Sequence, residues 1–130
     1  MATRKVLNLT QHAATADQIA VGVYDLSVED RKTLSNLLTF DDLPSVADLE
    51  ARAAKIADFA AYRVEPDDVD DCWVMVGCAS WFAGWLESAL RQEGITPLHA
   101  FSRREAVDVK QPDGSTIKTA VFRHVGFVGE

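Results

Sequence analysis

The hydrophobic positions of this chain follow two patterns, short continuous apolar runs and apolar residues at helical spacing. Lys5 to Leu9 predicts a short buried first strand. Cys72 to Gly77 is a continuous apolar run bounded by a turn signal, which is typical of a central parallel strand buried on both faces. The helical spacing is clearest from Ser45 to Tyr62, where apolar residues recur every three or four positions between charged ones. Strands that alternate with helices predict an α/β domain, with the two buried strands side by side.

Capping signals place the remaining helices. Thr15 stands three residues before Gln18, the spacing of a capping box, so a short helix is expected directly after Thr15. Ser27 is expected to cap a helix that runs through about Thr39. A further helix is predicted from about Trp81 to Glu93, because the small residues before it form a turn and Gly94 follows as a C-cap.

The last third of the chain reads as strands. Thr96 to Arg104 predicts a third parallel strand, and the residues from Glu105 to Val128 alternate around the turn sequence Pro112-Asp113-Gly114, which indicates a hairpin. The expected architecture is a single domain over residues 1–130. Its fold class is α/β, a Rossmann-like parallel sheet with flanking helices, extended by a C-terminal antiparallel β-hairpin.

The charge balance narrows the classes of partner. The chain of 130 residues carries a formal net charge of −7, which argues against binding of duplex nucleic acid through a broad basic face. The charge is uneven, because residues 41–71 hold ten acidic residues against three basic ones, whereas residues 95–130 hold five basic against four acidic. An anion site is therefore expected to use the carboxyl-terminal third.

The sequence lacks the signals of membrane insertion and secretion. No apolar run approaches the roughly 18 residues of a membrane span, and the amino end lacks the apolar core of a secretory signal. A cytoplasmic protein without membrane contacts is expected. Cys72 and Cys78 are separated by five residues, which is neither a metal-knuckle nor a redox spacing, so both are expected to be reduced core cysteines.

Three polar segments are expected at one edge of the sheet, where the carboxyl ends of parallel strands meet the amino ends of helices and favour an anion. They follow the first strand, the central strand and the next one. The candidate site residues from these segments are Asn8, Thr10, Gln11, His12, Ser80, Ser102, Arg103 and Arg104. The set contains hydroxyls, amides, guanidinium groups and an imidazole but no carboxylate cluster, so neither a catalytic metal nor a cofactor is expected.

Each of these residues also has a purely structural interpretation. His12 can be a hydrogen bonder in a loop, Ser80 can cap the following helix, and the arginines can form surface ion pairs with Glu105. Neighbours in a strand leave on opposite faces, so only one arginine can readily enter a pocket, and Arg103 is preferred over its neighbour. The tryptophans of the helix after Ser80 are expected mainly in the core, with an exposed patch for dimerisation or base stacking as the alternative.

The segment "VLNLTQHAATADQ" resembles a family of small CRISPR-associated Rossmann-like proteins, in which a first strand ends in an asparagine, a serine or threonine, and a histidine before a helix start. These are the ring nucleases and related binders of cyclic oligoadenylate in type III CRISPR defence. The resemblance covers mainly residues 5–18, and in this sequence Gln11 stands between the hydroxyl residue and His12.

The resemblance implies a CARF-like fold, a homodimer and metal-independent cleavage of cyclic oligoadenylate or a similar cyclic nucleotide. The ribose 2′-hydroxyl would attack the adjacent phosphate and leave a 2′,3′-cyclic phosphate. The implied catalytic residues are His12, which would assist proton transfer, and Arg103, which would hold the phosphate. The implied ligand-binding residues are Asn8, Thr10, Gln11, Ser80, Trp81, Ser102 and Arg104.

Two other functions use the same residues. A non-catalytic sponge or sensor of cyclic nucleotides would bind in the same pocket without aligning the hydroxyl for attack. A dimeric interaction protein of a defence or mobile-element locus would use Trp81 and Trp85 as a protein interface, while the polar rim would only cap helices.

Overall fold

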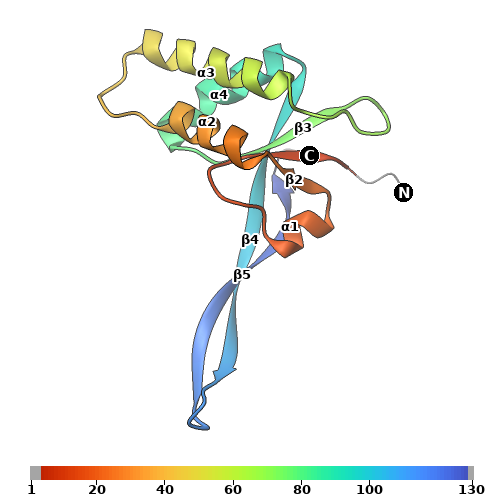
Figure 1. Cartoon of the computed structure of the whole chain (residues 1–130), viewed down its shortest axis with the longest axis vertical. Coiled ribbons are helices and arrows are strands. Elements are labelled where there is room, and N and C mark those ends of the chain that lie inside the picture. The colour runs from red at the N-terminus through yellow and green to blue at the C-terminus, as the bar shows by residue number, and fades with distance from the viewer. Residues whose placement is uncertain (1–3, 129–130) are drawn as a thin grey trace.

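The computed structural model describes residues 4–128 and has a mixed α/β architecture, a five-stranded curled sheet with flanking helices (Figure 1). The strands are β1 (Val6–Leu9), β2 (Val23–Asp25), β3 (Cys72–Val76), β4 (Ile95–Lys110) and β5 (Thr116–Val128). The helices are α1 (Ala16–Ala20), α2 (Val28–Leu38), α3 (Val46–Ala61) and α4 (Ser80–Gln92). No helix within the described residues is long and apolar enough to cross a membrane.

The sheet has the strand order β2-β1-β3-β4-β5. The first four strands are parallel, and the last pair, β4 and β5, is antiparallel. The predicted contact between the two apolar runs is confirmed, because β1 lies directly beside β3. From β1 the chain passes to β2 on one side and later to β3 on the other, so the strand order reverses between β1 and β3.

The two faces of the sheet carry unequal layers. Helices α2, α3 and α4 cover one face and lie together in Figure 1. Their core includes Leu34, Ile56 and Leu86, each of which is fully buried against the strands. On the other face a smaller cluster is formed by Val6, Val23, Met75 and Leu98, and the five-residue helix α1 lies against β2 and β5.

The helix starts follow the predicted capping residues. Thr15 accepts from the backbone of Gln18, whose side chain accepts in return from Thr15 N, so the predicted capping box is confirmed. Ser27 caps α2, and Ser45 forms a second capping box with Asp48 at the start of α3. These caps satisfy backbone N–H groups that the helices leave free.

Strand β4 is longer than the sequence analysis expects. Thr96 to Arg104 does not end a strand at the sheet edge, because β4 continues to Lys110 and pairs with β5 from His99 to Lys110. The two strands extend beyond the rest of the molecule as a projecting ribbon (Figure 1). Its turn contains Gly114 with φ of 89°, as the hairpin prediction required.

Candidate functional site

The candidate site is a crevice at the carboxyl ends of β1 and β3, beside His99 and Ala100 of β4. It has a volume of about 480 Å³, and its polar lining comes from Thr10, His12, Thr15, Gln18 and His99. The crevice lies where the strand order reverses between β1 and β3, which is the usual ligand position in open α/β sheets. Its size is in the range of small-molecule sites.

Asn8 holds the loop that forms one wall of this crevice. The side chain is 2% exposed, and its amide nitrogen donates to His12 O at 2.7 Å and to Asp25 Oδ1 at 2.8 Å. Its oxygen accepts from Thr10 N at 3.1 Å and from Thr10 Oγ1 at 2.7 Å. Both N–H groups and both lone pairs of the amide are therefore used within the protein, so Asn8 positions the loop rather than facing a ligand.

Asp25, at the end of β2, extends this network. Its Oδ1 also accepts from Ala14 N at 3.0 Å, and its Oδ2 accepts from Arg31 Nη2 at 3.3 Å. The loop after β1 is thus fastened to β2 and to α2 through one carboxylate.

His12 presents its imidazole to the crevice from this fastened loop. Its backbone is fixed at both ends, since His12 N donates to Thr10 Oγ1 at 3.3 Å and His12 O accepts from Asn8. The side chain is exposed, and within residues 4–128 no hydrogen bond to the ring is formed. An imidazole in this state can donate or accept a proton.

His99 on β4 also lines the crevice, and the sequence analysis does not identify it. Neighbouring residues of a strand leave on opposite faces, so the side chain of His99 leaves on the face covered by α4, whereas Leu98 belongs to the smaller cluster on the other face. His99 Nε2 lies 2.8 Å from Glu87 Oε1 of α4. A carboxylate on one ring nitrogen fixes the ring and its tautomer, and leaves the other nitrogen for a ligand.

Gly77 allows the ends of β1 and β3 to approach each other. A Cβ at this position would lie 3.2 Å from Thr10 Cγ2, which is closer than ordinary van der Waals contact. The absent side chain therefore keeps the floor of the crevice open beside Thr10.

The start of α4 lies next to the same edge of the sheet. Ser80 is the first residue of the helix, and the N-cap is Ala79, which provides no side-chain hydrogen bond. The interpretation of Ser80 as the helix cap is therefore wrong, since a cap requires the residue that precedes the first turn. Trp81 is 53% exposed and packs edge-on against Phe40 at 5.2 Å between ring centroids, whereas Trp85 packs against the core.

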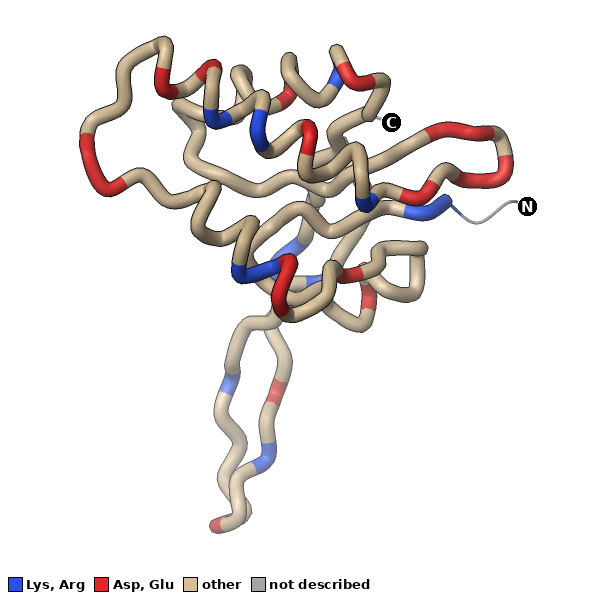
Figure 2. Tube along the Cα trace, turned by 45° about the horizontal axis from the view of Figure 1, so that its top comes forward, with Lys and Arg blue, Asp and Glu red and all other residues tan. Residues whose placement is uncertain are grey.

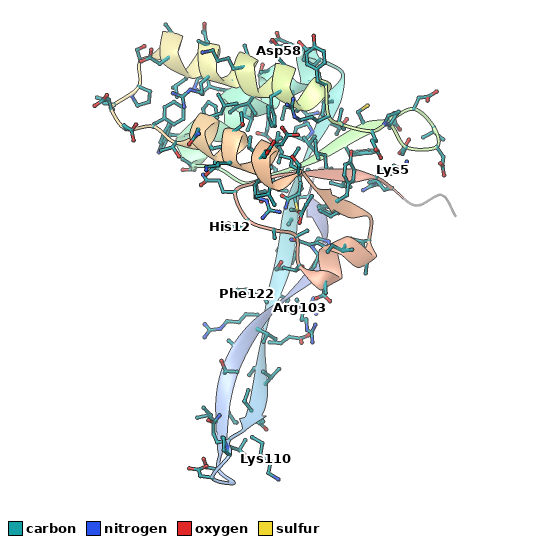
Figure 3. The ribbon with its side chains drawn as sticks, in the orientation of Figure 1. Lys5, His12, Asp58, Arg103, Lys110 and Phe122 are labelled. Atoms are coloured by element: carbon teal, nitrogen blue, oxygen red, sulfur yellow. The ribbon has the colours of Figure 1, made fainter. Side chains whose placement is uncertain are left out.

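The other predicted site residues lie away from the lining of the crevice. Ser102, Arg103 and Arg104 belong to the part of β4 that pairs with β5, because β4 continues where the prediction ends it. Figure 3 labels Arg103 on this ribbon. Arg103 pairs across the ribbon with Arg123, which itself lies 3.5 Å from Asp17 of α1.

Gln11 and the two cysteines have structural contacts. Gln11 Oε1 accepts from Ser35 Oγ of α2 at 3.2 Å. Cys72 and Cys78 are free and partly buried, and burial raises the pKa of both thiols. In the described part of the chain, no three side chains of the metal-binding types gather as ligands do.

The comparisons with known proteins place the chain in a family. Residues 4–128 match the Uncharacterized protein MJ1673 family, and the chain belongs to it. No curated protein and no solved structure matches the chain.

Proposed function

We propose that this member of the MJ1673 family is a ring nuclease, which binds a cyclic oligoadenylate or a similar cyclic nucleotide in the crevice and cleaves it without a metal. The observation that carries the proposal is that two histidines, His12 and His99, line one cavity at the strand-order reversal. The Rossmann-like and CARF-like assignment of the fold belongs to the same proposal, which the parallel order β2-β1-β3-β4 supports.

Two imidazoles suit this reaction because it moves one proton off an oxygen and one proton onto another. One ring takes the proton of the ribose 2′-hydroxyl as O2′ forms a bond to the adjacent phosphorus. The other ring gives a proton to the 5′-oxygen as the P–O5′ bond breaks. The products are a 2′,3′-cyclic phosphate and a free 5′-hydroxyl, so the ring opens and no metal enters the balance. Glu87 would hold the His99 ring for its part.

The start of α4 favours the charge of the phosphate. Its first turn has backbone N–H groups without a side-chain cap, and a helix start attracts anions. Thr15 and Gln18 line the crevice, and the capping box uses their side-chain oxygens only as acceptors, so the Thr15 hydroxyl and the Gln18 amide nitrogen supply hydrogen bonds to ribose or phosphate. The Thr10 hydroxyl already donates to Asn8 Oδ1. Arg103 stays a predicted phosphate ligand, which would have to reach the crevice from the base of the ribbon.

The test is an incubation of the purified protein with cyclic tetra- and hexaadenylate in the presence of EDTA, followed by chromatography and mass spectrometry. We expect linear products with 2′,3′-cyclic phosphate ends. His12→Ala and His99→Ala should each lower the cleavage rate about 100-fold or more, the range of a lost general acid or base. His124→Asn is the matched control, because this histidine lies in β5 and outside the lining of the crevice.

Each alternative outcome contradicts the proposal in its own way. Tight binding with an intact ring over hours would replace it with a non-catalytic sponge or sensor. No detectable binding of any cyclic nucleotide by calorimetry would favour an interaction protein. Equal loss of activity in the His124 control would assign the histidine effects to folding.

A further inference from the structure

The ribbon formed by residues 102–110 and 116–124, which we call the arm, touches α1 at its base through Arg123 and Asp17, but towards its tip the described residues form no layer that covers it. It projects from the rest of the molecule, which we call the body, in Figures 1 and 2. Most of its side chains on both faces are exposed. Nine residues in each strand correspond to a length of about 30 Å at 3.3 Å per residue.

One face of the arm is apolar towards its tip. Val109 pairs with Ile117 at the tip, and the next pairs on the same face are Val107 with Thr119 and Val121 with Glu105. Val109 is 41% exposed and Ile117 is 54% exposed. The opposite face near the tip carries polar and charged pairs, Asp108 with Lys118 and Lys110 with Thr116.

This construction is unfavourable for a ribbon surrounded by water. An isolated two-stranded hairpin is marginally stable, and a third element against its apolar face is needed to make it stable. The arm also has open strand edges, which are templates for pairing with another chain. The face and the edges together require a protein surface that the described residues of one copy do not supply.

The charge of the arm is complementary to the body of a second copy of this chain. Residues 101–124 contain five basic and three acidic residues, whereas the rest of the sequence contains eight basic and seventeen acidic residues. Figure 2 shows both basic and acidic positions on the arm, and runs of acidic positions in the loops of the body. A positive arm and a negative body attract each other between copies, and such complementarity steers association.

We propose that the arm of each copy clasps the body of a second copy, with its apolar face against it, to give a closed two-fold dimer. A ribbon about 30 Å long and two strands wide offers a face of about 300 Å². Two reciprocal contacts, counted on both partners, bury about 1,200 Å² in total, which reaches the size of a stable interface. This dimer depends on the arm alone and would form whether or not the crevice cleaves a nucleotide.

The first test is the mass in solution, measured by light scattering after size-exclusion chromatography at micromolar concentrations. We expect twice the chain mass of 14.3 kDa for the natural protein. Ile117→Lys should weaken the dimer at least tenfold, because it places a charge on the apolar face. Thr116→Lys is the matched control, since it adds the same charge to the next residue on the opposite face and should leave the dimer intact. Circular dichroism checks that both variants fold.

The second test shows which surfaces touch. A carboxyl-to-amine cross-linker is applied to a mixture of isotopically heavy and light copies, and heavy-to-light links should join Glu105, which lies on the same face of the arm as Val107 and Val109, to lysines of the body. The clasp is overturned by a monomeric natural protein, by a dimer that Ile117→Lys does not weaken, or by links that join arm to arm only. A dimer equally strong at low and high salt would also overturn it, because salt screens charge attraction.

Discussion

At the scale of single residues, the side chain of Asn8 fixes the loop that carries His12. It is the one buried polar side chain among residues 4–128, and it joins the end of β1 to the loop after it and to Asp25 of β2. A buried amide with every donor and acceptor used is stable, whereas removal of it leaves its partners unsatisfied. The loop that carries His12 therefore depends on a residue that has no free group for a ligand.

Asn8→Ala should lower the free energy of unfolding by about 1–3 kcal/mol, since Thr10 N, His12 O and an oxygen of Asp25 lose a partner in a partly buried site. Urea denaturation monitored by circular dichroism measures the change. Gln11→Ala is the control in the same loop. Its side chain has only an exposed bond to Ser35, so its effect should stay within about 0.5 kcal/mol. Equal stability of Asn8→Ala and the natural protein would show that the hydrogen bonds of Asn8 do not stabilise the fold.

At the scale of elements, α2 and the end of α3 are joined by an ion pair. Arg63 Nε lies 3.0 Å from Asp30 Oδ2, and Arg63 Nη2 donates to Asp30 Oδ1 at 3.1 Å. The hydrogen bond from Arg63 lowers the pKa of the Asp30 carboxyl. A carboxyl with a lowered pKa in the folded state stabilises the fold above its ordinary value of about 3.9, and this contribution is lost as the pH falls through the lowered value.

Asp30→Asn should therefore be less stable than the natural protein at pH 7, and the difference should shrink as the pH falls below about 4. Thermal unfolding followed over a series of pH values measures it. Glu29→Gln, one position earlier on α2 and without an ion pair within the described residues, should show a much smaller pH-dependent difference. A gap between Asp30→Asn and the natural protein that is constant from pH 7 to pH 2 would mean that the carboxylate charge has no part in it.

The elements also show why some of the fold could be predicted and some could not. The caps Thr15 and Ser45 have a local mechanism, so their helices start where the sequence indicates. Strand β2 has only three residues, too few for an alternating pattern to be recognised. The predicted end of β4 at Arg104 is wrong. Arg103 and Arg104 resemble a polar strand end, although they lie within a ribbon that is exposed on both faces.

The sequence indicates where the candidate site lies, but it indicates only some of the residues that line it. The loop after β1 and its His12 follow from the position of polar residues after a buried strand. His99 lies among apolar residues of a strand, and its partner Glu87 is 12 positions away on α4. The sequence shows a single histidine after an apolar run. Its place in the candidate site depends on a tertiary contact with Glu87, which no sequence spacing predicts.

At the scale of the whole molecule, the body has a packed core and the arm has none. Gly114→Ala should destabilise the turn of the arm, because φ at this position is 89° and a side chain in the left-handed region costs about 1–2 kcal/mol. Amide hydrogen exchange should accelerate about fivefold or more in the arm at this free-energy change, without a change in the body.

The matched control has the opposite sign. Gly84→Ala lies inside α4, where an added Cβ meets nothing within 4 Å, and alanine is favoured over glycine in a helix by about 0.5–1 kcal/mol. This variant should raise the stability of the body and leave exchange in the arm unchanged. Parallel changes of exchange in arm and body for both variants would show that the two parts unfold as one unit.

Because β4 is continuous, a small rotation near the body produces a larger displacement at the tip of the arm. His99 in the crevice and Lys110 at the tip belong to one unbroken strand, with a register shift at Phe101 and Ser102 between them. At 3.3 Å per residue the tip lies about 36 Å from His99 and about 28 Å from the register shift, so a rotation of about 10° at that shift moves the tip by about 5 Å. A spectroscopic label on the tip would therefore magnify small displacements in the crevice into distances that can be measured.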